Sequence, residues 1–147
     1  MQHDTYSDTY IRDILGEVRT IALVGASPKE DRPSYRVMKY MQDNGYRVIP
    51  VNPGLVGQQI LGETVYGSLE AIPGPFEMVD VFRNSEAAGG VTDEALAAAA
   101  AKGIRVVWMQ LDVRNDEAAT RAEAAGVKVV MNRCPKIELA RLGRPHR

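Results

Sequence analysis

The sequence contains very little cysteine and histidine, and its charges nearly cancel. Its one cysteine, Cys134, has no partner for an internal disulfide, and a metal site built from several cysteines is excluded. Eighteen basic and nineteen acidic residues leave a net charge of −1. That balance provides no general field for a nucleic acid or an anionic membrane, so any anion site must be local.

Long hydrophobic runs are also missing, since no apolar stretch approaches the roughly 20 residues that cross a bilayer. The polar, acidic N-terminus over residues 1–15 resembles neither a signal nor a transit peptide. We therefore expect a cytoplasmic protein that binds neither membranes nor nucleic acids. At 147 residues the chain suits a single domain, with an ordered core over 8–142 and a frayed tail over 143–147.

Residues typical of catalytic sites are scarce as well. The histidines, His3 and His146, lie at opposite termini, where the sequence positions neither of them as a general base. There is no serine-nucleophile signature, no cluster of metal ligands and no lysine-bearing phosphate loop. We therefore expect no catalytic residues, no metal site and no enzymatic activity of the chain on its own.

What the sequence does contain is a series of short apolar runs rich in valine and isoleucine. Nearly continuous runs of this kind are typical of parallel strands that helices cover on both faces. The predicted strands are 20–25, 47–51, 78–82, 104–109 and 127–131. The predicted helices are 8–17, 34–44, 92–102, 115–125 and 134–142. Three helices end at a glycine that can adopt a left-handed conformation, namely Gly45, Gly103 and Gly126.

This alternation predicts an α/β fold, a doubly wound parallel sheet of about five strands in a three-layer α/β/α arrangement. The segment 52–77 interrupts the pattern with many glycines and prolines. We expect a loop there, with a short strand at 64–66 and a short helix near 68–72. The topological switch is expected in this segment, with the second and third strands lying outward of the first.

The carboxyl ends of the first three strands are the predicted ligand site, because open parallel sheets bind ligands at that edge near the switch. Gly25 follows the first strand and allows a tight turn. The N–H groups of Ala26 and Ser27, with the start of the helix near Ser34, can then cradle an anion. Nearby positive charge can come from Lys29, Arg32 and Arg36. The alternative is that Gly25 is merely a turn, Ser34 caps its helix, and the charges are solvated.

The loop differs from a nicotinamide-dinucleotide fingerprint, which needs three glycines and an acidic residue after the second strand. Here Gly25 is the one glycine of the loop, and Asn52-Pro53 stands where the acid should be. A carboxylate would repel a phosphate on the ribose, whereas an amide tolerates one. The sequence therefore argues against NAD and permits a ribose-phosphorylated adenine nucleotide, which leaves NADP open.

Four stretches together resemble the small bacterial and archaeal CoA-binding proteins: "IALVGASPKEDRPSYRVMKYMQDNGYRVIPVNP", "VDVFRNSEAAGGV", "VVWMQLDVRNDEA" and "VVMNRCPKIE". These proteins share the fold of the CoA-binding N-terminal domain of the succinyl-CoA synthetase α subunit. The resemblance covers residues 10–142 and implies a Rossmann-like domain with coenzyme A or an acyl-CoA as its ligand. The phosphorylated histidine of that subunit lies in a second domain, which has no counterpart in this sequence, so synthetase activity is not implied.

The resemblance also implies which residues contact CoA. The phosphates map to the loop after the first strand and to the start of the next helix, and the adenosine maps to the end of the second strand. The turn after the third strand lies over the ligand. The implied CoA-binding residues are Gly25, Ala26, Ser27, Ser34, Arg36, Val51, Asn52, Pro53, Phe82 and Arg83. The pantetheine arm needs an apolar trough, for which Phe82 is a candidate, while Trp108 and Met109 are expected mainly in the core.

Two further residues leave alternatives open. Cys134 follows the last strand at the ligand end and precedes Pro135, so it either lies beside the CoA thiol and forms a mixed disulfide with it, or is buried and inert. Asp80 lies inside a predicted strand and is expected to hydrogen-bond a neighbouring loop. The leading hypothesis is a non-catalytic carrier, sensor or regulatory module. The alternatives are an NADP-linked oxidoreductase domain and a ligand-free protein-interaction module, with a homodimer or an unidentified protein partner left open.

Overall fold

A parallel sheet of five strands forms the middle layer of the molecule. The computed structural model describes residues 1–143. The strands are β1 (Thr20–Val24), β2 (Arg47–Val51), β5 (Met78–Val81), β6 (Val106–Met109) and β7 (Lys128–Val130). Their order in the sheet is β2-β1-β5-β6-β7. This confirms the predicted Rossmann-like, doubly wound α/β sheet.

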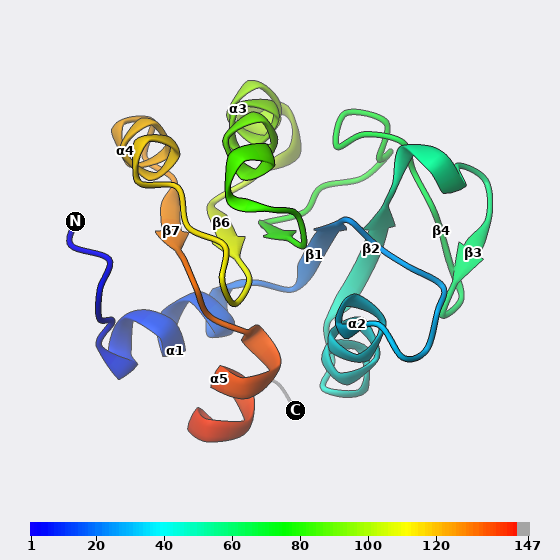
Figure 1. Ribbon diagram of the computed structural model, residues 1–147, viewed down its shortest axis with the longest axis horizontal. Coiled ribbons are helices and arrows are strands. Elements are labelled where there is room, and N and C mark those ends of the chain that lie inside the picture. Colours follow the sequence, from blue (N-terminus) through cyan, green and yellow to red (C-terminus); the bar gives the residue numbers. More distant parts are fainter. Residues whose placement is uncertain (144–147) are drawn as a thin grey trace.

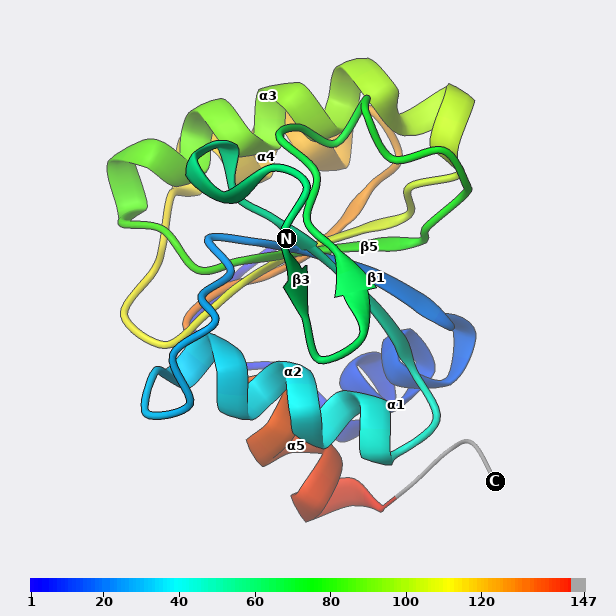
Figure 2. The ribbon, with the colours of Figure 1, turned by 90° about the vertical axis from the view of Figure 1, so that its right-hand side faces the viewer.

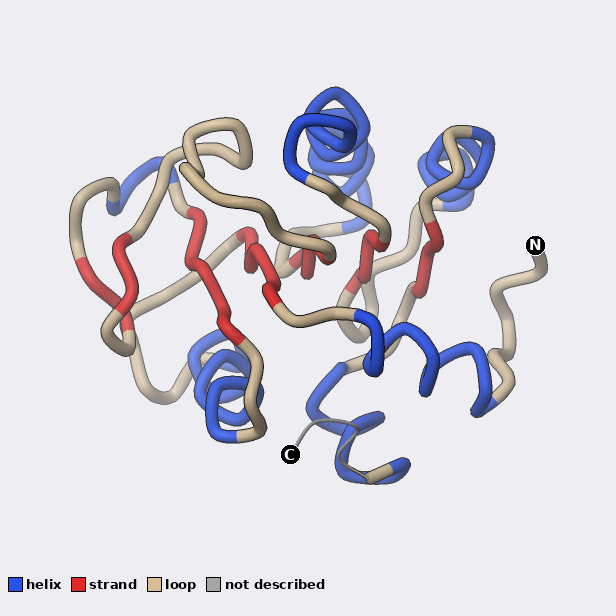
Figure 3. The backbone as a smooth tube through the Cα atoms, turned by 180° about the vertical axis from the view of Figure 1, so that it is seen from behind, coloured by secondary structure: helices blue, strands red, loops and turns tan. Residues whose placement is uncertain are grey.

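Helices cover both faces of the sheet (Figure 1). On one face lie α3 (Ser85–Lys102) and α4 (Asp116–Ala124). On the other lie α1 (Asp8–Glu17), α2 (Pro33–Asp43) and α5 (Pro135–Leu142). Successive strand side chains point to opposite faces, so each strand contributes to two hydrophobic cores, with Ala22 and Val24 in one and Ile21 and Leu23 in the other. The backbone tube of Figure 3 shows the strands between the two helical layers.

The predicted order of the strands was wrong in one respect. The third apolar run, β5, pairs directly with β1, so that Leu23 lies beside Asp80. On its other side β1 pairs with β2. The switch is nevertheless in segment 52–77, as predicted, because the chain leaves β2 and re-enters the sheet across β1. The apolar runs of the central strands have similar sequences, so the sequence does not specify which strands pair with each other.

Segment 52–77 packs on the sheet without forming the predicted helix. A turn occupies residues 68–72, where the Ile72 N–H donates to the Leu69 carbonyl at 3.2 Å. Leu69, Ile72 and Phe76 are fully buried in the core beneath α3. The segment also forms a short hairpin of β3 (Gln59–Ile60) and β4 (Glu63–Thr64), which only partly overlaps the predicted strand at 64–66. Figure 1 shows the hairpin at the edge of the sheet beyond β2, and in Figure 2 the hairpin faces the viewer.

The helices begin and end for local reasons. Helix α3 starts seven residues before the predicted 92–102, because the Asn84 side chain caps it by accepting from the Ala87 N–H at 2.7 Å. The prediction began at residue 92 because only the alanine-rich second half of α3 has a strong helix propensity. The glycines that follow α2, α3 and α4 all have positive φ, as predicted: 94° at Gly45, 78° at Gly103 and 82° at Gly126.

The tail predicted to fray covers residues 143–147. Except for Gly143, these residues, His146 among them, lie outside the described part of the chain. Over residues 1–143, no helix combines the length and the apolar character that a membrane crossing requires.

Candidate functional site

A cavity of about 550 Å³ opens at the carboxyl ends of β1, β2 and β5. We call it the loop cavity, because the turn after β1 forms much of its wall. Its lining includes Gly25, Ser27, Lys29, Arg32, Ser34, Asn52 and Phe82. The three strand ends therefore converge on one crevice, as the sequence predicts.

Gly25 holds the turn close to the neighbouring strand. Its φ is 93°, and a Cβ built on it would lie 2.2 Å from the carbonyl oxygen of Phe82. The Phe82 N–H donates to the Val24 carbonyl at 2.8 Å, and the Gly25 N–H donates to the Val51 carbonyl at 3.0 Å. Both flanking strands thus fix the backbone at a separation that only glycine fits.

The amides of this loop are not all available to a ligand. The Ala26 N–H donates to the Val51 carbonyl at 3.3 Å, so it is less free than the predicted anion cradle requires. The Ser27 N–H makes no hydrogen bond to a described residue. The Ser27 Oγ accepts from the Lys29 N–H at 3.2 Å and shapes the turn. The predicted cradle is therefore reduced to the Ser27 amide and the first turn of α2, whose N–H groups have no partner within the helix.

Ser34 does not cap α2. The N-cap is Arg32 and Pro33 occupies the first helical position, so the hypothesis of Ser34 as a simple cap was wrong. Its side chain is 5% exposed, lines the loop cavity and makes no hydrogen bond to a described residue. A hydroxyl that lines a cavity and has no partner within residues 1–143 is suited to donate to a ligand oxygen.

The end of β2 fixes the loop from the other side. The Asn52 Nδ2 donates to the Ala26 carbonyl at 2.9 Å, and its Oδ1 accepts from the Gly54 N–H at 2.9 Å. Asn52 thus positions the loop and brings no negative charge to the cavity. Val51 is buried and contributes its carbonyl, while Pro53 is exposed and begins a 3₁₀ turn over Pro53–Leu55.

The positive charges divide between two surfaces. Lys29 and Arg32 are exposed on the rim of the loop cavity, and neither forms an ion pair within residues 1–143. Arg36 instead donates to the Asp31 carbonyl and lines a separate groove with Tyr40. The structure therefore does not bring Arg36 to the other predicted contacts.

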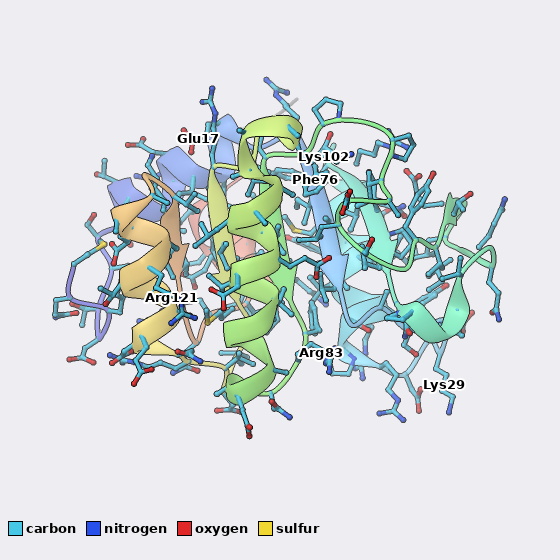
Figure 4. All side chains as sticks on the ribbon, turned by 90° about the horizontal axis from the view of Figure 1, so that it is seen from above. Glu17, Lys29, Phe76, Arg83, Lys102 and Arg121 are labelled. Carbon is cyan, nitrogen blue, oxygen red and sulfur yellow. The ribbon has the colours of Figure 1, made fainter. Side chains whose placement is uncertain are left out.

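A second cavity of about 610 Å³ adjoins the first, and Pro33 and Phe82 line both. We call it the Cys134 cavity; its lining also includes Arg83, Gln110, Val113 and Cys134. Figure 4 shows Arg83 and Lys29 at the same edge of the molecule, opposite Phe76 and Lys102. Trp108 and Met109 are fully buried in the two cores, as expected.

Gln110 is a residue that the sequence did not single out. It directly follows β6, so its place at the ligand edge was the available signal. Asp80, by contrast, is 1% exposed, and its Oδ1 is buried without a hydrogen-bond partner in the described chain. The predicted bond from Asp80 to a loop is absent from that part of the chain, and burial raises the pKa of its carboxyl well above the ordinary 3.8.

A parallel sheet of order β2-β1-β5-β6-β7, with a glycine turn and a helix start at the edge of its first strand, defines a Rossmann-like domain. A model of the family described as CoA binding domain matches residues 19–140. The chain belongs to that family.

Similar proteins come from bacteria and archaea. The Bacillus subtilis (strain 168) protein YneT is 40% identical over 131 residues, which are 89% of this chain and 93% of YneT. A solved structure from Pyrococcus horikoshii OT3 is 40% identical with a TM-score of 0.86, covering 97% of this chain and 96% of that one. A structure from Thermus thermophilus is 35% identical with a TM-score of 0.86, covering 94% and 100%.

Proposed function

We propose that the protein binds coenzyme A or an acyl-CoA in the loop cavity and acts as a non-catalytic carrier, sensor or regulatory module. The observation that carries this proposal lies around one cavity: within residues 1–143, the Ser27 amide, the Ser34 hydroxyl and the cations of Lys29 and Arg32 have no partner. Membership in the CoA binding domain family supports the same ligand.

The charge of CoA matches what the cavity offers. CoA carries a diphosphate and a ribose phosphate, which need N–H donors and fixed positive charge. The Ser27 amide and the first turn of α2 suit the diphosphate, because a helix N-terminus favours anions. Lys29 and Arg32 lie beside them on the rim. The Asn52 side chain is neutral, so it does not repel a phosphorylated ribose.

The composition of the loop cavity supports a role without chemistry. Its described lining contains no aspartate, glutamate, histidine or cysteine, the residues that most often serve as a general base or nucleophile. His3 lies elsewhere, where its ring nitrogens bond the Tyr6 hydroxyl at 2.7 Å and the Glu123 carboxylate at 3.0 Å. The loop cavity would therefore hold the phosphates of CoA without reacting with them.

Ligand preference tests the proposal directly. We expect a rise in Tm with CoA and acetyl-CoA, a smaller rise with NADP and none with NAD, measured in parallel by thermal shift at equal concentrations. A rise with NADP alone would favour the oxidoreductase alternative. No rise with any nucleotide would favour the protein-interaction module and contradict our proposal.

A matched pair of arginines tests where the phosphates bind. We expect Arg32→Ala to weaken CoA binding about tenfold, as loss of one charge-assisted contact does. Arg36→Ala should change it less than about twofold, because an exposed charge outside the cavity acts only through a screened field. Isothermal titration calorimetry at 0.15 M salt measures both. Equal losses in the two variants would place the phosphates elsewhere.

A further inference from the structure

The Cys134 cavity contains a side-chain amide with no partner in the described part of the chain. Gln110 is 6% exposed and lines this cavity, and its Oε1 is buried without a hydrogen bond to any residue of 1–143. Its backbone is fixed, because the Gln110 N–H donates to the Val81 carbonyl at 3.3 Å and its carbonyl accepts from the Val113 N–H at 2.9 Å. An unsatisfied buried amide costs free energy unless a ligand supplies its partner.

Cys134 lies in the same cavity at a fixed position. It is the N-cap of α5, and its carbonyl accepts from the Glu138 N–H at 3.0 Å. The Trp108 Nε1 donates to the carbonyl of the preceding Arg133 at 2.9 Å and anchors the turn. The cysteine is 7% exposed, so a reagent must enter the cavity to reach its sulfur.

The two cavities adjoin at Pro33 and Phe82. Both are lined by Pro33 and Phe82, so a ligand anchored by its phosphates at Ser27 and Ser34 can extend past the phenyl ring toward Cys134. The arm of CoA that leaves the diphosphate carries two amides and ends in a thiol. Its chemistry therefore matches, in order, the apolar ring, the unpartnered carboxamide and the sulfur.

We propose that the Cys134 cavity receives the pantetheine arm, that Gln110 hydrogen-bonds an amide of the arm, and that Cys134 exchanges with the disulfide of CoA. In this step the Cys134 thiolate attacks one sulfur of CoA disulfide. The sulfur–sulfur bond of the reagent breaks, a bond between Cys134 and one CoA forms, and the second CoA leaves as a thiolate that takes a proton from water. The Cys134 proton passes to solvent, and no other oxidant is needed. This inference rests on the proposed binding of CoA.

Selectivity for CoA disulfide follows from the geometry. The loop cavity holds the adenosine phosphates, which makes the attack at Cys134 effectively intramolecular and raises the local concentration of the reacting sulfur. Glutathione disulfide lacks the nucleotide and must reach a nearly buried thiol without that anchor. The site would therefore report the oxidised fraction of the CoA pool through a reversible adduct.

Intact-protein mass spectrometry over time tests the inference. With equal concentrations of the two disulfides, we expect the CoA adduct to form at least about tenfold faster than the glutathione adduct, which is a modest gain for a tethered reaction. Peptide mapping should place it on Cys134, and dithiothreitol should remove it. Cys134→Ser should gain no adduct. Gln110→Leu and Arg32→Ala should slow the CoA reaction and leave the glutathione reaction unchanged.

Calorimetry with reduced CoA on Cys134→Ser separates this inference from the proposed function. If that variant binds CoA while the wild type reacts no faster with CoA disulfide than with glutathione disulfide, the inference fails and the binding function stands. If neither protein binds CoA, the proposed function itself fails. A wild type that gains an adduct only after denaturation in urea would show a reactive but inaccessible sulfur, which also overturns the inference.

Discussion

Gly25→Ala should strongly weaken CoA binding and destabilise the fold. The added methyl would meet the Phe82 carbonyl oxygen at 2.2 Å, and the residue's φ of 93° strains any side chain. Backbone strain and overpacking each cost about 1–3 kcal/mol, so we expect a loss of roughly 3 kcal/mol in the free energy of unfolding. Displacing the loop also moves the Ser27 amide away from the phosphates, which should weaken binding about a hundredfold or more.

Gly103→Ala is the matched control for that variant. Gly103 also has a positive φ, 78°, but a Cβ there would meet no atom within 4 Å. It ends α3 at the opposite edge of the sheet from the loop cavity. We expect a destabilisation of about 1 kcal/mol from the left-handed conformation alone, with unchanged CoA affinity. Urea unfolding and calorimetry on both variants make the comparison. Wild-type affinity in Gly25→Ala would contradict the role given to the loop.

Asp80→Asn should stabilise the protein at neutral pH. The Asp80 carboxyl is 1% exposed between Leu23 and Trp108 of the neighbouring strands, and its Oδ1 has no hydrogen-bond partner among residues 1–143. Ionising it there is unfavourable, so burial raises its pKa well above 3.8. A neutral amide of the same shape avoids that cost, and we expect a gain of about 1–3 kcal/mol at pH 7.

The pH dependence has a definite sign. Between pH 3.8, where the unfolded carboxyl titrates, and the raised folded pKa, the folded protein holds a proton that the unfolded chain has released. The contribution of the protonated Asp80 is therefore complete below pH 3.8 and is lost as the pH rises through the folded pKa. Urea unfolding of wild type and Asp80→Asn from pH 4 to 8 isolates this effect, since all other groups are shared. Parallel stability curves would show that Asp80 does not titrate as described.

The strands and helices were predictable because their signals are local. Valine and isoleucine runs gave the five strands of the sheet, and Gly45, Gly103 and Gly126 gave the helix ends. The pairing of β1 with β5 was not predictable, because it depends on how the connection between β2 and β5 packs on the sheet. The turn over 68–72 replaced a helix since its apolar side chains, among them Leu69, fill the core under α3.

The candidate site was predictable in position and less so in detail. Gly25, Ser27, Asn52 and Phe82 share one cavity because parallel strand ends meet at one edge. The side chain of Arg36 does not reach the loop cavity. Ser34 and Val37 lie on the buried face of α2, and the residues between them lie on other faces of the helix. The position of Gln110 after β6 could be predicted, but its lack of a partner within residues 1–143 could not, because a sequence does not show whether a buried group finds a partner.

A crystal structure of the protein with CoA tests the central claim most directly. The account predicts the diphosphate at the Ser27 N–H and the first turn of α2, a phosphate within reach of Lys29 or Arg32, and the arm running past Phe82. Coenzyme bound in the Arg36–Tyr40 groove, or a loop cavity closed by the protein's own side chains in the complex, would contradict it.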